Sequence, residues 1–160
     1  VYLSQEVSIF RGLTVRENIM AVLEMFPMAV EEMEDRCELL LKQLNIHHLK
    51  GRHSYNLSGG ERRRCEIARA LATNPRFIFL DEPFVGIDPI TISDIQEIIK
   101  QLKKSGIGIV LTDHNVRNAL EIIDRAYIIC DGKILIEGTA NQLLESEEAR
   151  KIYLGERFKM

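Results

Sequence analysis

The sequence predicts an α/β protein in which helices flank a parallel β-sheet, and three observations lead to this class. Short apolar runs typical of strands alternate along the chain with longer amphipathic runs typical of helices. Two of the strands, residues 77–80 and 108–112, are almost wholly apolar, as expected for a parallel sheet that is covered on both faces. Before the first of them, residues 14–49 contain helical patterns and no strand, which indicates a helical subdomain.

The first part of the chain is predicted to be mainly helical. Residues 1–3 resemble the end of a strand and lead into a loop. Thr14 and Glu17 have the spacing of a capping box, which predicts a helix over 14–24. A second helix is predicted over 30–44 because its apolar residues recur on one face: Met33, Cys37, Leu40, Leu41 and Leu44.

The later elements alternate between helix and strand. Helices are predicted over 60–73, 89–104 and 116–123, and strands over 77–80, 108–112 and 126–130. Asp131-Gly132 is a typical two-residue hairpin turn, so the last strand should return antiparallel over 133–137. The predicted fold therefore adds a C-terminal β-hairpin and helices to the sheet.

Composition excludes several classes of protein. The chain has 160 residues, 46% of them hydrophobic and 28% charged, which fits one ordinary globular domain. A net charge of −3 gives no reason to expect a nucleic-acid partner. No apolar run approaches the roughly 20 residues that a membrane helix needs. Three widely spaced cysteines, Cys37, Cys65 and Cys130, favour reduced core thiols over a disulfide or metal site.

The first chemical motif is Leu57-Ser58-Gly59-Gly60-Glu61, a glycine turn that opens a helix. A helix N-terminus offers unpaired N–H groups and partial positive charge, and two glycines allow an anion to come close. Ser58 and Glu61 also form a capping box, which needs no ligand. Three cations in the first turn, Arg62-Arg63-Arg64, oppose the helix dipole and favour a nearby anion.

The second motif is the apolar strand that ends in Leu80-Asp81-Glu82-Pro83. Carboxylates at the carboxyl edge of a parallel sheet lie where ligands bind. There Asp81 would hold Mg²⁺, in part through water, and Glu82 would orient and deprotonate an attacking water. The alternative is a solvated strand end. His114 follows the next strand and should reach the same edge, where it would bond a γ-phosphate or play a structural part.

Both motifs are parts of nucleotide triphosphatases, but the phosphate-binding loop of such enzymes is absent. The pattern G-x-x-x-x-G-K-[ST] occurs nowhere in the 160 residues, and the chain opens on Val1 rather than methionine. We therefore expect the phosphate loop to lie upstream in a longer protein. The 160 residues alone are predicted to lack ATPase activity.

The order of the motifs resembles the ATP-binding cassette (ABC) family of transporter ATPases, which have a P-loop NTPase-like fold. The likeness rests on Gln5, Leu57 to Glu61, Leu80 to Pro83, Gly86-Ile87-Asp88 and His114. It implies that Gln5 contacts the metal ion and water. It also implies that Leu57 to Glu61 and Asp88 contribute to ATP binding across a dimer, and that His114 is the switch histidine.

The same resemblance implies the other properties of the whole protein. The cofactors would be ATP and Mg²⁺, and the protein would act as a homodimer under transmembrane subunits at the cytoplasmic face of the inner membrane. The chain would be a partial nucleotide-binding domain, divided into a helical subdomain (14–56), the signature (57–61), a catalytic core (74–138) and a helical tail (139–160). Residues 85–88 resemble the D-loop of the family, but they read Val-Gly-Ile-Asp rather than the commoner Ser-Ala-Leu-Asp.

Finer matches resemble the lipopolysaccharide-export branch of this family. They are Ser8-Ile9-Phe10-Arg11, the triple arginine, Asp81 to Phe84, Thr112 to Arg117, and Tyr153-Leu154-Gly155-Glu156-x-Phe158. The branched-chain amino-acid import ATPases share several of these strings and are the alternative. A chromosome-maintenance ATPase head would need a long heptad coiled coil, which this sequence lacks, and a docking module without hydrolysis would not need Glu82 and His114.

Phe10 and Arg11 are candidates for docking a partner. They follow Gln5 in a predicted loop, and an aromatic ring beside a cation is a common anchor at protein interfaces. The alternative is that Phe10 packs into the helical subdomain.

Overall fold

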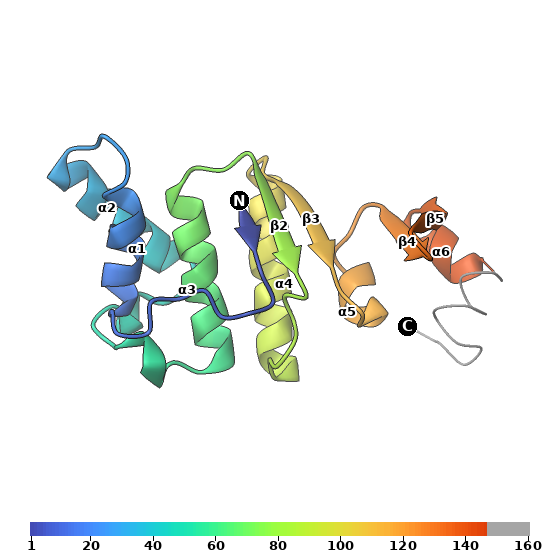
Figure 1. Cartoon of the computed structure of the whole chain (residues 1–160), viewed down its shortest axis with the longest axis horizontal. Helices are drawn as coiled ribbons and strands as arrows, with labels where there is room; N and C mark the ends of the chain where they lie inside the picture. The colour runs from blue at the N-terminus through green and yellow to red at the C-terminus, as the bar shows by residue number, and fades with distance from the viewer. Residues whose placement is uncertain (147–160) are drawn as a thin grey trace. The chain divides into compact units, whose positions relative to one another are not determined.

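The structure, a computed structural model, describes residues 1–146. These fall into two compact units, Val1–Thr112 and the residues from Asp113 onward, each of which is described by itself. Figure 1 shows the elements of both in chain order. The division into subdomain, signature, core and tail expected from the sequence remains a prediction.

The first unit contains a parallel sheet. Its strands are β1 (Tyr2–Leu3), β2 (Phe77–Asp81) and β3 (Gly108–Thr112), in the order β1-β2-β3. The register places Asp81 opposite Thr112, so β2 and β3 end at the same edge. The predicted α/β class with a parallel sheet is confirmed.

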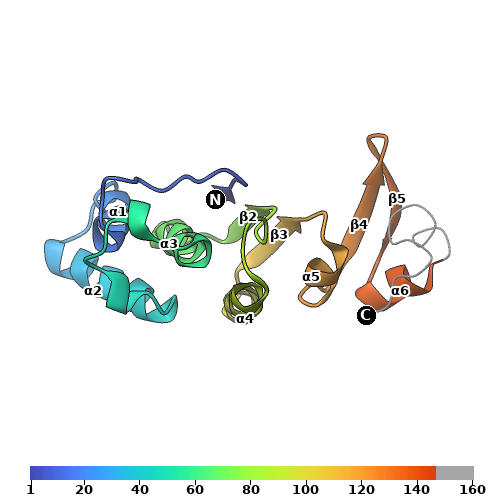
Figure 2. The same ribbon diagram turned by 90° about the horizontal axis from the view of Figure 1, so that it is seen from below.

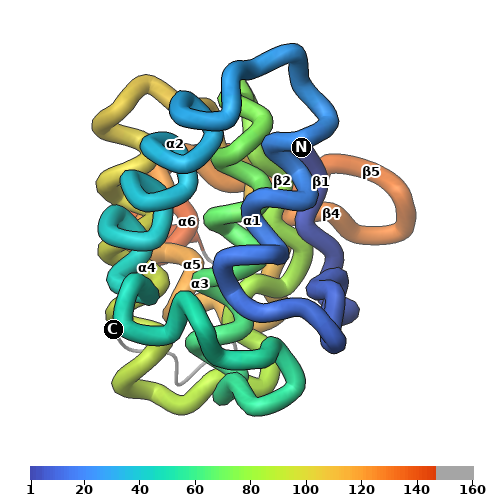
Figure 3. Tube along the Cα trace, turned by 90° about the vertical axis from the view of Figure 1, so that its left-hand side faces the viewer, coloured from blue at the N-terminus to red at the C-terminus, as the bar shows by residue number. Residues whose placement is uncertain are grey.

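Helices make up the rest of this unit. They are α1 (Val15–Leu23), α2 (Val30–Gln43), α3 (Gly59–Ala72) and α4 (Pro89–Lys104), with short 3₁₀ turns η1 (His47–Leu49) and η2 (Ser54–Asn56). Thr14 and Glu17 form the predicted capping box at the start of α1. α1, α2 and α3 pack on one another, and Figure 3 shows α1 beside α2, and β1 beside β2. The predicted helical region is therefore present.

One face of the sheet is buried and the other is exposed. Ile78 and Leu80 are buried and alternate along β2 with exposed residues. Figure 2 shows α4 on one side of β2 and β3, and the buried residues of α4 include Ile95 and Ile99. On the other side Tyr2, Phe77, Phe79 and Val110 are 48–63% exposed. Among the described residues of this unit no helix covers that face. Within residues 1–112 the predicted coverage by helices is therefore present on one face of the sheet only.

The second unit contains α5 (Val116–Leu120), β4 (Ala126–Cys130), β5 (Lys133–Gly138) and α6 (Ala140–Glu145). β4 and β5 form the predicted antiparallel hairpin, and Asp131 and Gly132 have φ angles of 48° and 73°, as a type I′ turn requires. Ile128 and Leu143 form its small core.

Two details of the second unit differ from expectation, and one motif lies outside the described residues. α5 ends at Leu120 rather than residue 123. The N–H of Ile122 donates to the carbonyl of Ala119, three residues earlier, so the chain forms a tight turn there instead of continuing the α-helix. Cys130 is exposed, whereas Cys37 and Cys65 are buried as expected. Burial raises the pKa of Cys37 to about 11 and of Cys65 to about 12, which keeps both protonated. The segment Tyr153 to Phe158 is not among the described residues.

Candidate functional site

The carboxylate of Asp81 lies at the carboxyl edge of the sheet, held by two hydroxyl groups. Thr112 Oγ1 donates to Asp81 Oδ1 at 2.5 Å, and the Tyr2 hydroxyl donates to Oδ2 at 2.7 Å. These two hydrogen bonds, with that from Thr112 the stronger, hold the pKa of Asp81 below its ordinary value. The side chain is therefore a charged acceptor near neutral pH, as a Mg²⁺ ligand must be.

Glu82 follows immediately and has an unusual backbone. Its φ angle is 41°, in the left-handed region that residues other than glycine seldom adopt. The turn is held by Glu82 N–H, which donates to Thr112 O at 2.9 Å, and by Glu82 O, which accepts from Val85 N–H at 3.2 Å. Such strain is concentrated at functional sites, where the surrounding structure maintains it.

A cleft of about 200 Å³ brings predicted site residues together. Gln5 comes from the loop after β1, Gly59 from the start of α3, and Glu82 from the turn after β2. The rest of its lining consists of Val7, Arg62, Arg63, Glu66, Pro83, Val85, Gly86 and Ile87. Three segments that are far apart in sequence thus surround one small space beside the end of β2.

Ser58 and Glu61 form a capping box at the start of α3. The Ser58 hydroxyl accepts from Glu61 N–H at 3.3 Å, and Glu61 Oε2 accepts from Ser58 N–H at 2.8 Å. Burial acts to raise the pKa of Glu61, but the bonds from Ser58 and the charge of Arg52 outweigh it and lower the pKa. The capping alternative is therefore confirmed, and ATP contact by this segment remains a prediction.

The three arginines after Glu61 have acceptors within the chain. Arg62 donates to Leu57 O, Arg63 pairs with Glu66, and Arg64 pairs with Asp94. Their presence therefore does not require a bound anion, which removes one argument for a phosphate at this helix.

The signature glycines are explained by packing. A Cβ on Gly60 would lie 2.0 Å from Thr91 Cγ2, and a Cβ on Gly59 would lie 3.1 Å from Gly86 O. The start of α3 thus lies directly against the first turn of α4. Leu57, just before it, is buried. Close packing was not considered in the interpretation of these glycines from sequence.

Asp88 has a structural role that the sequence analysis did not assign to it. It is the N-cap of α4, where its carboxylate accepts from Thr91 N–H at 3.0 Å and from Thr91 Oγ1 at 2.6 Å. These bonds lower its pKa. Asp88 is not part of the lining of the cleft, and its contribution to ATP binding remains a prediction.

Phe10 is exposed while its backbone is held firmly. Buried Asn18 accepts from Phe10 N–H at 2.9 Å and donates to Phe10 O at 3.0 Å. The ring is 50% exposed, with the Arg69 guanidinium 4.5 Å from its centre. Phe10 therefore does not pack in the core, and Arg11 beside it is exposed.

His114 is the second residue of the second unit. Its side chain is exposed. The predicted approach of His114 to the phosphates beside Glu82 therefore remains a prediction.

The residues at the sheet edge suit one metal ion with few protein ligands. No group of three or more His, Cys, Asp or Glu side chains that could hold a metal occurs within residues 1–146. Mg²⁺ bound to a nucleotide commonly takes one or two carboxylates and completes its shell with phosphate oxygens and water. Asp81, with both oxygens already oriented, fits that requirement.

The structure is an α/β cassette with a small cleft at the carboxyl edge of its parallel sheet, and comparison with known families identifies its class. The sequence model described as "ABC transporter" matches residues 1–85, more than half of the chain. The chain therefore belongs to the ABC transporter family.

Relatives and solved structures agree. The chain is 51% identical over 160 residues to the lipopolysaccharide export system ATP-binding protein LptB of Haemophilus influenzae, covering 99% of this chain but 66% of that protein. An ATP-binding cassette of an ABC transporter, solved in its ADP conformation, matches with a TM-score of 0.80 at 30% identity, over 98% of this chain and 68% of its own.

A second similar structure was solved as a dimer. It is a cassette in a dimeric post-hydrolysis state bound to ADP and Pi, and it matches with a TM-score of 0.75 at 28% identity, over 87% of this chain and 62% of its own.

Within residues 1–146, no helix is both long and apolar enough to cross a membrane.

Proposed function

We propose that this chain is part of the ATP-hydrolysing subunit of an ABC transporter that drives lipopolysaccharide export. The observation that carries the chemistry is the cleft that joins Gln5 and Glu82 beside the charged carboxylate of Asp81. The cargo rests on the 51% identity to a protein named for lipopolysaccharide export. Since the chain spans 66% of that relative's length, activity, cargo and partners of the whole protein are all proposals.

Four residues, two of them in the lining of the cleft, have distinct parts in the proposed reaction. Bound Mg²⁺ would neutralise phosphate charge, and Asp81 would hold it, in part through water. Glu82 accepts a proton from the attacking water, and Gln5, across the same cleft, orients that water. His114 would bond the γ-phosphate.

The active form is proposed to be a homodimer. Leu57 to Glu61 would contact ATP held by the second copy, with the N–H groups of Gly59 and Gly60 at the positive end of α3. The similar cassette solved as a dimer with ADP and Pi supports this arrangement. Transmembrane subunits would bind the dimer at the cytoplasmic face of the inner membrane, through Phe10 and Arg11, and no nucleic acid is involved.

Reconstitution tests the cargo. The full-length protein should co-purify with the membrane subunits of a lipopolysaccharide exporter and release lipopolysaccharide from proteoliposomes when ATP is added. Membrane subunits of a branched-chain amino-acid importer serve as the matched comparison. Assembly and ATP-driven transport with the importer subunits alone would replace the proposed cargo by the alternative.

Removal of the Phe10 ring should weaken docking. Because the Phe10 backbone is held by Asn18 while its ring is exposed, Phe10→Ala should remove an anchor without disturbing the fold. We expect about tenfold less membrane subunit in pull-downs, and a smaller loss of ATPase activity in the detergent-free protein. Phe26→Ala is the control, because Phe26 follows α1 and its side chain is also partly exposed, at 40%. Equal losses of docking and activity would favour a role in the core.

The 160 residues alone should neither bind ATP tightly nor remain monomeric. They contain no phosphate loop, which supplies the backbone nest and the lysine for the β- and γ-phosphates. The exposed sheet face with Phe77 and Phe79 should drive association. Isothermal titration with Mg-ATP should show no micromolar affinity, and light scattering should show oligomers.

A matched pair of variants tests the cause of association. Phe79→Ser should reduce it, whereas Leu39→Ser, at a leucine that is 52% exposed on α2, should not. Tight ATP binding by a monodisperse monomer would mean that other residues of this chain form the phosphate site.

A further inference from the structure

A buried ion pair on α3 has no part in the proposed site chemistry. Arg63 and Glu66 are 6% and 3% exposed, and Arg63 Nη1 lies 3.1 Å from Glu66 Oε2. A buried ion pair contributes little net stability, because the loss of hydration offsets the attraction. Arg63 Nε has no hydrogen-bond partner either, which adds to the cost of burial. The contacts of the pair therefore need another explanation.

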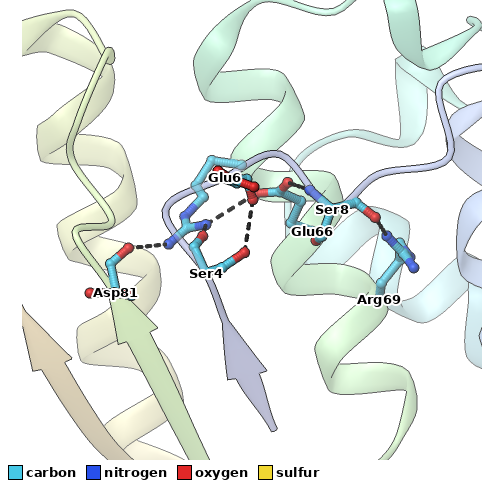
Figure 4. Close-up of polar contacts among 7 residues, drawn as sticks. Ser4, Glu6, Ser8, Glu66, Arg69 and Asp81 are labelled. Atoms are coloured by element: carbon cyan, nitrogen blue, oxygen red, sulfur yellow. Dashed lines mark hydrogen bonds and ion pairs between the residues drawn. The ribbon is translucent and has the colours of Figure 1, made fainter.

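The pair holds both ends of the loop that carries Gln5. Arg63 Nη1 donates to Ser4 O at 3.1 Å, and Glu66 Oε1 accepts from Ser8 N–H at 2.9 Å. Arg69, one turn further along α3, donates to Ser8 O at 2.6 Å. Figure 4 shows Ser4 and Ser8 at these contacts with α3. Gln5, between these anchors, lines the cleft.

The same guanidinium also reaches the end of β2. Arg63 Nη2 lies 3.5 Å from Asp81 O, a long contact directed at the backbone of the proposed metal ligand. One side chain on α3 thus contacts the loop before Gln5, the residue before Glu82, and Glu66 on its own helix. α3 itself begins at Ser58 and Gly59, four to five residues earlier. The pair therefore connects the signature end of α3 with both walls of the cleft.

We infer that Arg63, paired with Glu66, is a positioning residue that sets Gln5 and the end of β2 relative to the start of α3. This inference rests on the proposed function, because its effect is measured on ATP hydrolysis. In this inference Arg63 holds neither the metal ion nor the attacking water. It acts by fixing the two segments between which the water must be held, and misplacement of reacting groups by about 1 Å can cost on the order of 10²-fold in rate.

The shape of the guanidinium makes the test selective. Arg63→Lys keeps the charge, but its one nitrogen cannot occupy the positions of both Nη1, which contacts Ser4 and Glu66, and Nη2, which contacts Asp81. In the full-length protein we expect kcat to fall on the order of 10- to 100-fold, with KM for ATP within about threefold of the wild type. Arg64→Lys is the control, since the guanidinium of Arg64 pairs with Asp94 on α4 rather than with loop 4–8 or β2.

Coupling to Gln5 separates positioning from general stability. If Arg63 acts through the loop, Arg63→Lys should add little to the loss caused by Gln5→Ala, so the two effects should be far from additive. Should Arg63→Lys fail to fold, Arg63→Met combined with Glu66→Met removes both charges together, and this folded variant should still have a low kcat.

Different outcomes would overturn the role of Arg63 and the proposed ATPase function. A wild-type protein without ATPase activity would overturn the proposed function and the inference with it. An active wild type with normal kcat in Arg63→Lys would overturn the inference alone. So would a loss that is fully additive with Gln5→Ala, or a normal kcat in the double methionine variant.

Discussion

Glu82→Gln in the full-length protein is expected to lower kcat by about 10²–10⁴-fold, the usual contribution of a general base. Glutamine keeps the size of the side chain and the hydrogen bonds of the backbone turn at Thr112 and Val85, so the cleft should remain intact. ATP binding should be preserved. An ATP-bound dimer should accumulate, because without hydrolysis its two subunits no longer dissociate. Single-turnover kinetics and size-exclusion chromatography with Mg-ATP measure both effects.

The control is Glu97→Gln, which removes an equal charge from the exposed surface of α4, where Glu97 pairs with Lys100. This variant should retain normal turnover. Near-normal turnover in Glu82→Gln would place the base elsewhere in the protein. Loss of ATP binding in Glu82→Gln would instead indicate that the strained turn had changed shape.

Local signals predicted the elements well. α4 has the predicted bounds, Pro89–Lys104, since proline suits the first helical turn and Ser105-Gly106 ends the helix, whereas the N-cap role of Asp88 was found only in the structure. Gly106 indeed adopts a positive φ, of 86°. The hairpin at Asp131-Gly132 was predictable for the same reason, because the turn type depends on two adjacent residues.

Contacts between distant segments were not predictable in the same way. Tyr2 and Thr112 hold Asp81 because of the register of three parallel strands, which no local pattern specifies. The convergence of parallel strands at one edge is a general rule, and Asp81 does lie at that edge, with Glu82 next to it in the lining of the cleft. It could not identify which neighbours would donate hydrogen bonds.

The signature helix shows the limit of reading charge from sequence alone. Three arginines in a first helical turn suggested an anion, yet the structure gives each of them an acceptor in the chain: Leu57 O, Glu66 and Asp94. Glu66 lies one turn after Arg63 on α3 itself, whereas Asp94 lies on α4, so its proximity to Arg64 depends on how α3 packs against α4. The same packing explains why Gly60 has no side chain.

Gly60→Ala is therefore expected to destabilise the protein, although alanine is normally the better helix former by about 1 kcal/mol. The new Cβ would lie 2.0 Å from Thr91 Cγ2, so α3 and α4 would have to separate at their first turns. Overpacking of this kind costs typically about 1–3 kcal/mol. Urea unfolding of the full-length protein should show the loss as a lower midpoint.

Thr91→Ser is the compensating change, because serine lacks the Cγ2 methyl group but keeps the hydroxyl that donates to Asp88. Gly60→Ala combined with Thr91→Ser should recover most of the lost stability, leaving Thr91 Cβ at 3.2 Å as the nearest contact. A destabilised double variant would contradict the packing explanation. If stability returns while ATPase activity does not, the absence of a side chain at Gly60 serves the bound nucleotide as well as the packing of α3 on α4.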